Sequence, residues 1–146
     1  MSTREDAPTY PFSKILIEVI NQALPEASAR PARARTFKRV QSLISTGQIP
    51  LVLLSKKNAR AFINGTGPFR KFGKTKSFVI YNFGDLILLS ETNFPNRHAW
   101  QLTKVFMDPI SESLNAKSPL KTKQVTDIHK GTLMALSGES IPQLEQ

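Results

Sequence analysis

Apolar residues recur at helical spacing near the start of the chain. They follow the intervals i, i+3, i+4, i+7, i+8 and i+11, which predicts an amphipathic helix with one buried stripe. The stripe consists of Phe12, Ile15, Leu16, Val19, Ile20 and Ala23. Pro11 suits the first turn of this helix and Pro25 ends it. We expect residues 1–9 to be a flexible N-terminus and residues 25–35, which have no periodicity, to form a loop.

Three short apolar runs predict strands. Residues 49–54 form a continuous run bounded by turn residues, which is typical of a strand buried on both faces of a helix-covered sheet. Residues 77–81 and 86–90 are rich in β-formers and are separated by Asn-Phe-Gly-Asp. This spacing predicts two strands joined by a tight, hairpin-like connection.

Two helices are predicted around the first of these strands. Thr36 has the properties of an N-cap for a second helix, and Gly47 supplies the left-handed residue that stops it. A third helix is expected from Lys56 to Ile63, with Asn64-Gly65 at its end.

The last part of the chain predicts more helix. Apolar residues from Pro95 to Leu114 have core spacing, and Pro109 should kink or divide the helix because proline lacks the required N–H. Residues 125–136 form a final amphipathic segment. Strands interleaved with helices predict the α/β class, with a small mixed sheet flanked by helices. The length of 146 residues predicts one domain, with an α/β lobe over 10–120 and a C-terminal helical segment and tail over 121–146.

Positive charge is concentrated in the middle of the chain. Twenty Lys and Arg against eleven Asp and Glu give a net charge of +9, yet no acid occurs from Ala27 to Gly84. Besides Arg30, this stretch contains the basic patch: Arg33, Arg35, Lys38, Arg39, Lys56, Lys57, Arg60, Arg70, Lys71, Lys74 and Lys76. Such a segment indicates a site for a small anion, a nucleic acid or an acidic partner. The alternative is a solvated surface that only maintains solubility.

Several classes of function find no support. The absence of cysteine excludes disulfides, thiolate metal sites and a cysteine nucleophile, and His98 and His129 are not at metal-ligand spacing. No phosphate-binding P-loop or serine elbow is present. We therefore expect no enzyme activity, metal or cofactor. No apolar run approaches the roughly 18 residues of a membrane span, and the polar start lacks an export signal, which predicts a cytoplasmic location for the sequence as written.

The most distinctive string is Asn64-Gly65-Thr66-Gly67-Pro68-Phe69. Two glycines within three residues allow positive φ, and bare N–H groups there would cradle a carboxylate or phosphate beside Arg70 and Lys71. The same string is also typical of a helix C-cap followed by a Gly-Pro turn.

Four collinear segments resemble the TAXI family of solute-binding proteins, which serve tripartite (TRAP) carboxylate transporters. The segments are Tyr10-Pro11 with the first helix, Phe37–Ser55, Asn58–Phe69 (NARAFINGTGPF) and Leu86–Leu114. Together they cover about two thirds of the chain. The third is the most specific, because it matches the family's helix running into an NGTGPF turn.

The resemblance implies a single periplasmic-binding-protein-like lobe. Fewer than 20 residues separate Phe69 from Ile87, where the family inserts a second lobe, and the family's first strand and glycine-rich loop have no counterpart before Tyr10. The implied function is non-enzymatic: transport-related binding of a small anionic (carboxylate) solute, or of a protein partner. A second copy in a homodimer could supply the missing wall, and the family's location would be periplasmic. The implied ligand-binding residues are Thr9, Tyr10, Ser55, Asn58, Asn64, Gly65, Thr66 and Gly67.

A second hypothesis comes from the charge alone. The acid-free stretch would suit a basic nucleic-acid-binding or regulatory protein that reuses the same lobe.

Overall fold

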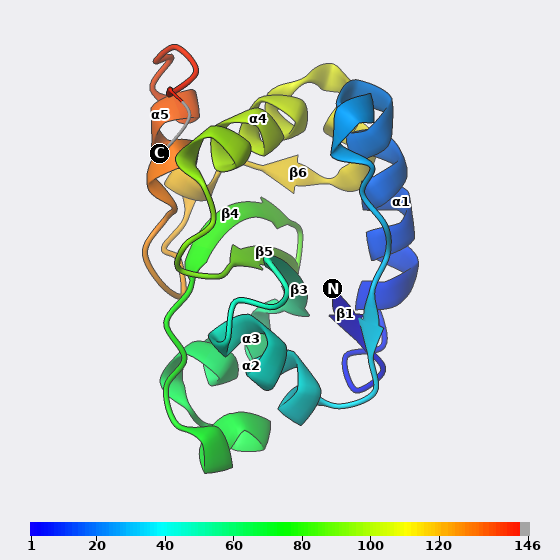
Figure 1. Cartoon of the computed structure of the whole chain (residues 1–146), viewed down its shortest axis with the longest axis vertical. Helices are drawn as coiled ribbons and strands as arrows, with labels where there is room; N and C mark the ends of the chain where they lie inside the picture. Colours follow the sequence, from blue (N-terminus) through cyan, green and yellow to red (C-terminus); the bar gives the residue numbers. More distant parts are fainter. Residues whose placement is uncertain (144–146) are drawn as a thin grey trace.

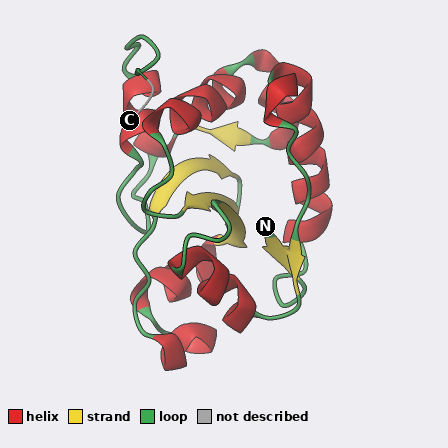
Figure 2. Cartoon of the chain, viewed as in Figure 1, coloured by secondary structure: helices red, strands yellow, loops and turns green. Residues whose placement is uncertain are grey.

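A computed structural model describes residues 1–143 and shows a sheet between two layers of helices (Figures 1 and 2). The predicted α/β class with a sheet flanked by helices is confirmed. The helices are α1 (Thr9–Ala23), α2 (Phe37–Ser45), α3 (Lys56–Asn64), α4 (Asn96–Met107) and α5 (Lys130–Leu136). Short 3₁₀ helices are η1 (Pro25–Ala27), η2 (Gly67–Phe72), η3 (Pro109–Leu114) and η4 (Pro119–Lys121). Within residues 1–143, no helix is long and apolar enough to cross a membrane.

The main sheet has four antiparallel strands in the order β3-β5-β4-β6. The strands are β3 (Leu51–Ser55), β4 (Phe78–Phe83), β5 (Leu86–Ser90) and β6 (Ala116–Lys117). The three predicted strands are confirmed, and β4 and β5 form the expected hairpin around Gly84-Asp85. Because β5 pairs with both β3 and β4, it lies in the middle of the sheet although it is the third of these strands in the chain.

A second, parallel pair extends this sheet. It consists of β1 (Ser2–Thr3) and β2 (Arg33–Ala34). The Met1 amine donates to the Leu51 carbonyl at 2.9 Å, and the Leu53 N–H donates to the Met1 carbonyl at 2.8 Å, which places β1 parallel to β3. Burial lowers the pKa of this amine to about 6. The strand order at this edge is therefore β2-β1-β3.

The start of the chain is ordered, and the prediction of a flexible N-terminus over 1–9 is wrong. Ser2, Thr3 and Thr9 have no exposed surface, and Asp6 is 4% exposed. Hydrogen bonds to residues distant in the sequence hold this segment in place, and a purely local pattern carries no trace of them. The predicted loop over 25–35 likewise contains η1 and β2.

The helix boundaries follow the predicted signals. The Thr36 hydroxyl accepts from the Arg39 N–H at 3.2 Å at the start of α2, and Gly47 lies at φ +72° just beyond its end. Pro109 divides the long C-terminal helix into α4 and η3.

The final amphipathic segment is only partly helical, so the prediction of a helical segment there is partly wrong. Ile128 pairs with Val79 in extended conformation, and α5 begins only at Lys130. The buried His129 ring caps this helix by accepting from the Gly131 N–H at 3.0 Å. An apolar pair three residues apart, Val125 and Ile128, fits an extended edge as well as a helix. Residues 144–146 of the predicted tail lie outside the described residues.

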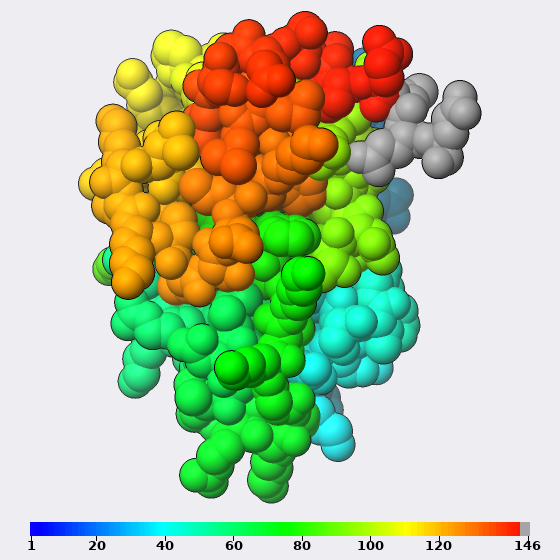
Figure 3. Space-filling model, turned by 90° about the vertical axis from the view of Figure 1, so that its left-hand side faces the viewer, coloured from blue at the N-terminus to red at the C-terminus, as the bar shows by residue number. Residues whose placement is uncertain are grey.

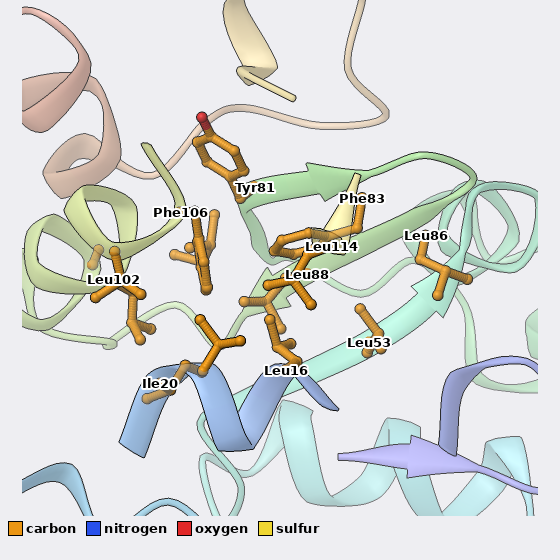
Figure 4. Packing of buried hydrophobic residues seen from close by; sticks show 14 of the residues in the cluster. Leu16, Ile20, Leu53, Tyr81, Phe83, Leu86, Leu88, Leu102, Phe106 and Leu114 are labelled. Carbon is orange, nitrogen blue, oxygen red and sulfur yellow. The ribbon is translucent and has the colours of Figure 1, made fainter. Parts of the chain in front are cut away.

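Side chains of the central strands alternate between two cores. Val52 and Leu54 face α2, α3 and η2, whereas Leu53 faces α1 and α4. Figure 4 shows the second of these cores, in which Leu53 lies with residues of α1, α4, β4 and β5. This arrangement explains the continuous apolar run that predicted a strand buried on both faces.

Candidate anion-binding site

Three helices begin at one end of the molecule. Each parallel strand leads into a helix: β1 into α1, β2 into α2 and β3 into α3 (Figure 1). Because the strands are parallel, their carboxyl ends and the N-termini of the helices that follow lie along the same edge of the sheet. The first N–H groups of a helix lack partners within it and carry partial positive charge, which suits an anion. β1 lies between β2 and β3, so the next strand in the chain is placed on one side of β1 and the one after it on the other side. Open α/β sheets bind ligands at the carboxyl ends of the strands where the strand order reverses in this way.

The loop between β1 and α1 brings two carboxylates to this edge. A Glu5 carboxylate oxygen accepts from the Phe37 N–H, at the start of α2, at 2.7 Å. An Asp6 carboxylate oxygen accepts from the Ser55 N–H, directly before α3, at 2.7 Å. The chain's own acids therefore occupy two positions that a bound anion would otherwise take.

Six cations surround these helix starts. They are Arg33, Arg35, Lys38, Arg39, Lys56 and Lys57, all exposed. None of them makes an ion pair in the part of the chain that the structure describes. Neither α2 nor α3 has an acid in its first turn. Cations at the positive end of a helix are unfavourable by about 0.3–1 kcal/mol each, so helix stability does not account for their placement.

The predicted residues near the helix starts have different environments. The Tyr10 ring lies 4.4 Å from the Arg33 guanidinium carbon and 5.2 Å from the Lys14 amine. Ser55 and Asn58 are half-buried in the first turn region of α3. The Thr9 hydroxyl instead donates to the Asp6 carbonyl at 2.7 Å inside the loop, so this buried group organises the loop and is not presented to a ligand.

The glycine-rich turn lies away from these residues. α3 has nine residues, so Asn64 is about 13 Å from Ser55 along the helix axis. The N–H groups of Gly65 and Thr66 both donate to the Ala61 carbonyl, which completes the C-terminal cap of α3. The expectation of bare amides at these two residues is therefore wrong, and the structure has the alternative arrangement, a helix C-cap followed by a turn at Gly67.

The basic patch continues from the helix starts over α3 and η2. Its remaining members, all exposed, are Arg60, Arg70, Lys71, Lys74 and Lys76. Figure 3 shows residues 60–76, drawn in green, at the lower end of the molecule. The members of the patch therefore lie on the surface and are accessible to a partner. Among residues 1–143, no three His, Cys, Asp or Glu side chains lie close enough to hold a metal ion.

We expect the Asp6→Asn substitution to lower the free energy of unfolding by about 1–2 kcal/mol, because a charge-assisted hydrogen bond between the buried Asp6 carboxylate and the Ser55 N–H becomes a neutral one. Urea denaturation measures the loss. Glu5→Gln is the matched control: Glu5 is exposed, so a change below about 0.5 kcal/mol is expected. Equal effects of both substitutions would contradict the role assigned to Asp6.

Comparison of the chain with known protein families, with curated proteins and with solved structures finds no match.

Proposed function

We propose that the chain is a non-enzymatic binding module whose ligand is an anion held at the carboxyl ends of β1, β2 and β3. The observation that carries this proposal is the group of six exposed cations without ion pairs that lie within or directly before the first turns of α2 and α3. An anion bound there would offset their mutual repulsion and their unfavourable position at the positive ends of helices. Glu5 and Asp6 neutralise only part of this charge.

We propose further that the fold is a single lobe of the kind found in TAXI solute-binding proteins. The strand order β2-β1-β3, with β5 antiparallel between β3 and β4, supports it. Only Gly84 and Asp85 join β4 to β5, so no second lobe is inserted there. A single lobe contacts a ligand from one side only, so ion pairs with the ligand stay exposed to solvent. Exposed ion pairs contribute only about 0–1 kcal/mol each to the binding free energy. A small carboxylate alone should therefore bind with millimolar affinity, and tighter binding requires a second chain, such as a homodimer partner, over the site.

Titration of the isotopically labelled protein with succinate, followed by amide chemical shifts, tests this function. We expect saturable shifts at Phe37, Ser55 and their neighbours, with affinity weakened about fivefold or more by the double substitution Lys56→Gln/Lys57→Gln. Lys104→Gln on α4 is the control and should leave affinity unchanged. A folded protein without saturable shifts at these amides would refute carboxylate binding at this edge.

A second candidate function is nucleic-acid binding, and a specific observation favours it. The exposed basic patch extends over α2, α3 and η2, a surface wider than a small solute covers. Each phosphate of duplex DNA that is neutralised contributes about −0.9 to the slope of log K against log salt. Arg70→Gln/Lys71→Gln distinguishes the candidates, because it should reduce that slope by about 2 and leave succinate binding unchanged. Absence of DNA binding at low salt would exclude this candidate.

A further inference from the structure

We infer that the chain has a second binding site, separate from the basic patch, that takes a small amphipathic molecule with an aliphatic tail and a carboxylate head. The site is a cavity of about 560 Å³ beside the core between α1, the sheet and α4. Its volume lies within the range of about 300–1,000 Å³ that is typical of small-molecule sites.

The walls of this cavity are predominantly aliphatic and come from distant parts of the chain. Leu16, Ile17 and Ile20 contribute from α1, Leu51 and Leu53 from β3, Leu88 from β5, and Leu102 from α4. In Figure 4, Leu16 and Ile20 point from α1 towards Leu88 and Leu102, across the space between α1 and α4. Aliphatic side chains that border an empty cavity lack van der Waals contacts on that side. An aliphatic ligand supplies those contacts and needs no hydrogen-bond partners there.

Two polar groups of the lining are buried and already hydrogen-bonded: the Ser13 hydroxyl donates to the Tyr10 carbonyl, and the Met1 amine donates to the Leu51 carbonyl. The other polar residues of the lining have solvent access. Arg30, His98 and Glu26 are exposed, and Gln101 is half-buried, which places them at the mouth. Arg30 makes no ion pair within residues 1–143, so its guanidinium is available to bind a carboxylate through two parallel hydrogen bonds. Glu26 is the one acid among the lining residues and disfavours a second negative charge. A single anionic head next to an aliphatic tail fits this arrangement, whereas a dicarboxylate or a phosphate ester does not.

The segment that carries Arg30 forms one wall of the cavity. Residues 28–32 belong to no helix or strand and are attached at three points, the first being the Ser28 N–H, which donates to the Pro25 carbonyl at 3.3 Å. The Asn21 side chain donates to the Ala29 carbonyl at 2.9 Å and accepts from the Ala29 N–H at 2.8 Å, and the Ser2 N–H donates to the Ala32 carbonyl at 2.9 Å. Few contacts have to break for this segment to admit a ligand, while the Asn21 contact holds Arg30 over the mouth.

Decanoate is the probe that tests this site, with decanol as the uncharged molecule of equal chain length. We expect saturable decanoate binding by calorimetry and shifts of the Leu16, Leu88 and Leu102 methyl signals. Arg30→Gln should weaken decanoate about tenfold and leave decanol unchanged. Lys117→Gln removes an exposed cation outside both the cavity and the basic patch, and this control should change neither.

Ile17→Trp separates binding in the cavity from adsorption elsewhere. Ile17 is half-buried at the rim, so the indole can fill the cavity from its edge without displacing fully buried side chains. We expect this variant to keep its circular dichroism and lose decanoate and decanol binding more than about tenfold. Unchanged affinity in folded Ile17→Trp, or no methyl shifts at saturating decanoate, would overturn the site. Because succinate binding at the other edge is measured separately, failure of one site leaves the other standing.

Discussion

The Phe69→Ala substitution is expected to lower the free energy of unfolding by about 3–5 kcal/mol, the usual cost of removing a fully buried phenyl ring. Phe69 is the apolar anchor of η2. Its ring centroid lies 4.9 Å from that of Phe37 on α2 and 5.1 Å from that of Phe62 on α3, both in edge-to-face geometry. Loss of this ring therefore loosens the contact between α2, α3 and η2, which carry most of the basic patch.

Guanidinium denaturation monitored by circular dichroism measures this effect. Phe72→Ala is the control, since Phe72 is only half-buried at the end of η2 and should cost clearly less than Phe69→Ala. A loss below about 1 kcal/mol for Phe69→Ala would show that η2 does not stabilise α2 and α3.

The Gly65→Ala substitution is expected to cost about 2–4 kcal/mol, because it combines two penalties. Gly65 lies at φ +65°, a conformation that side chains disfavour by roughly 1 kcal/mol. An added Cβ would also overlap the backbone of Gly73 and come within 2.6 Å of the Lys74 N atom. Backbone atoms do not yield as a flexible side chain does, so the turn must shift.

Gly47→Ala is the control that leaves only the conformational penalty. Gly47 also follows the end of a helix, at φ +72°, and an added Cβ would meet only a Glu91 carboxylate oxygen at 3.9 Å, an ordinary contact. This control should therefore cost only about 1 kcal/mol, through conformation alone. Thermal unfolding of both variants compares them, and equal losses would show that the approach of residues 73–74 to Gly65 does not restrict this position.

Elements with strong local signals could be predicted from the sequence. The stripe in α1, the Thr36 cap and the apolar run of β3 each depend on residues close together in the chain, so their patterns are complete within a short window. β1 and β2 could not be predicted in this way. Each has two residues, and Ser2 and Thr3 are polar yet fully buried. The Ser2 N–H donates to the Ala32 carbonyl and the Thr3 N–H to the Thr9 hydroxyl, so neither backbone donor needs water.

The candidate site shows the same limit. The basic patch could be predicted, because charged residues can be counted along the chain and no acid occurs from Ala27 to Gly84. The roles of Glu5 and Asp6 were not, because their partners Phe37 and Ser55 are 32 and 49 residues away. For Asn64–Gly67 the sequence left two interpretations, and only the hydrogen bonds to Ala61 distinguish a helix cap from an anion cradle.

The central position of β5 has a consequence for synthesis of the chain on the ribosome. β3 and β4 are translated first, but their common neighbour ends at Ser90. Until that residue has emerged, the apolar edges of both strands lack the partner that holds them together, and α2 and α3 have no completed sheet to cover. The segment that carries the basic patch therefore remains only partly folded on the ribosome until the hairpin of β4 and β5 is complete.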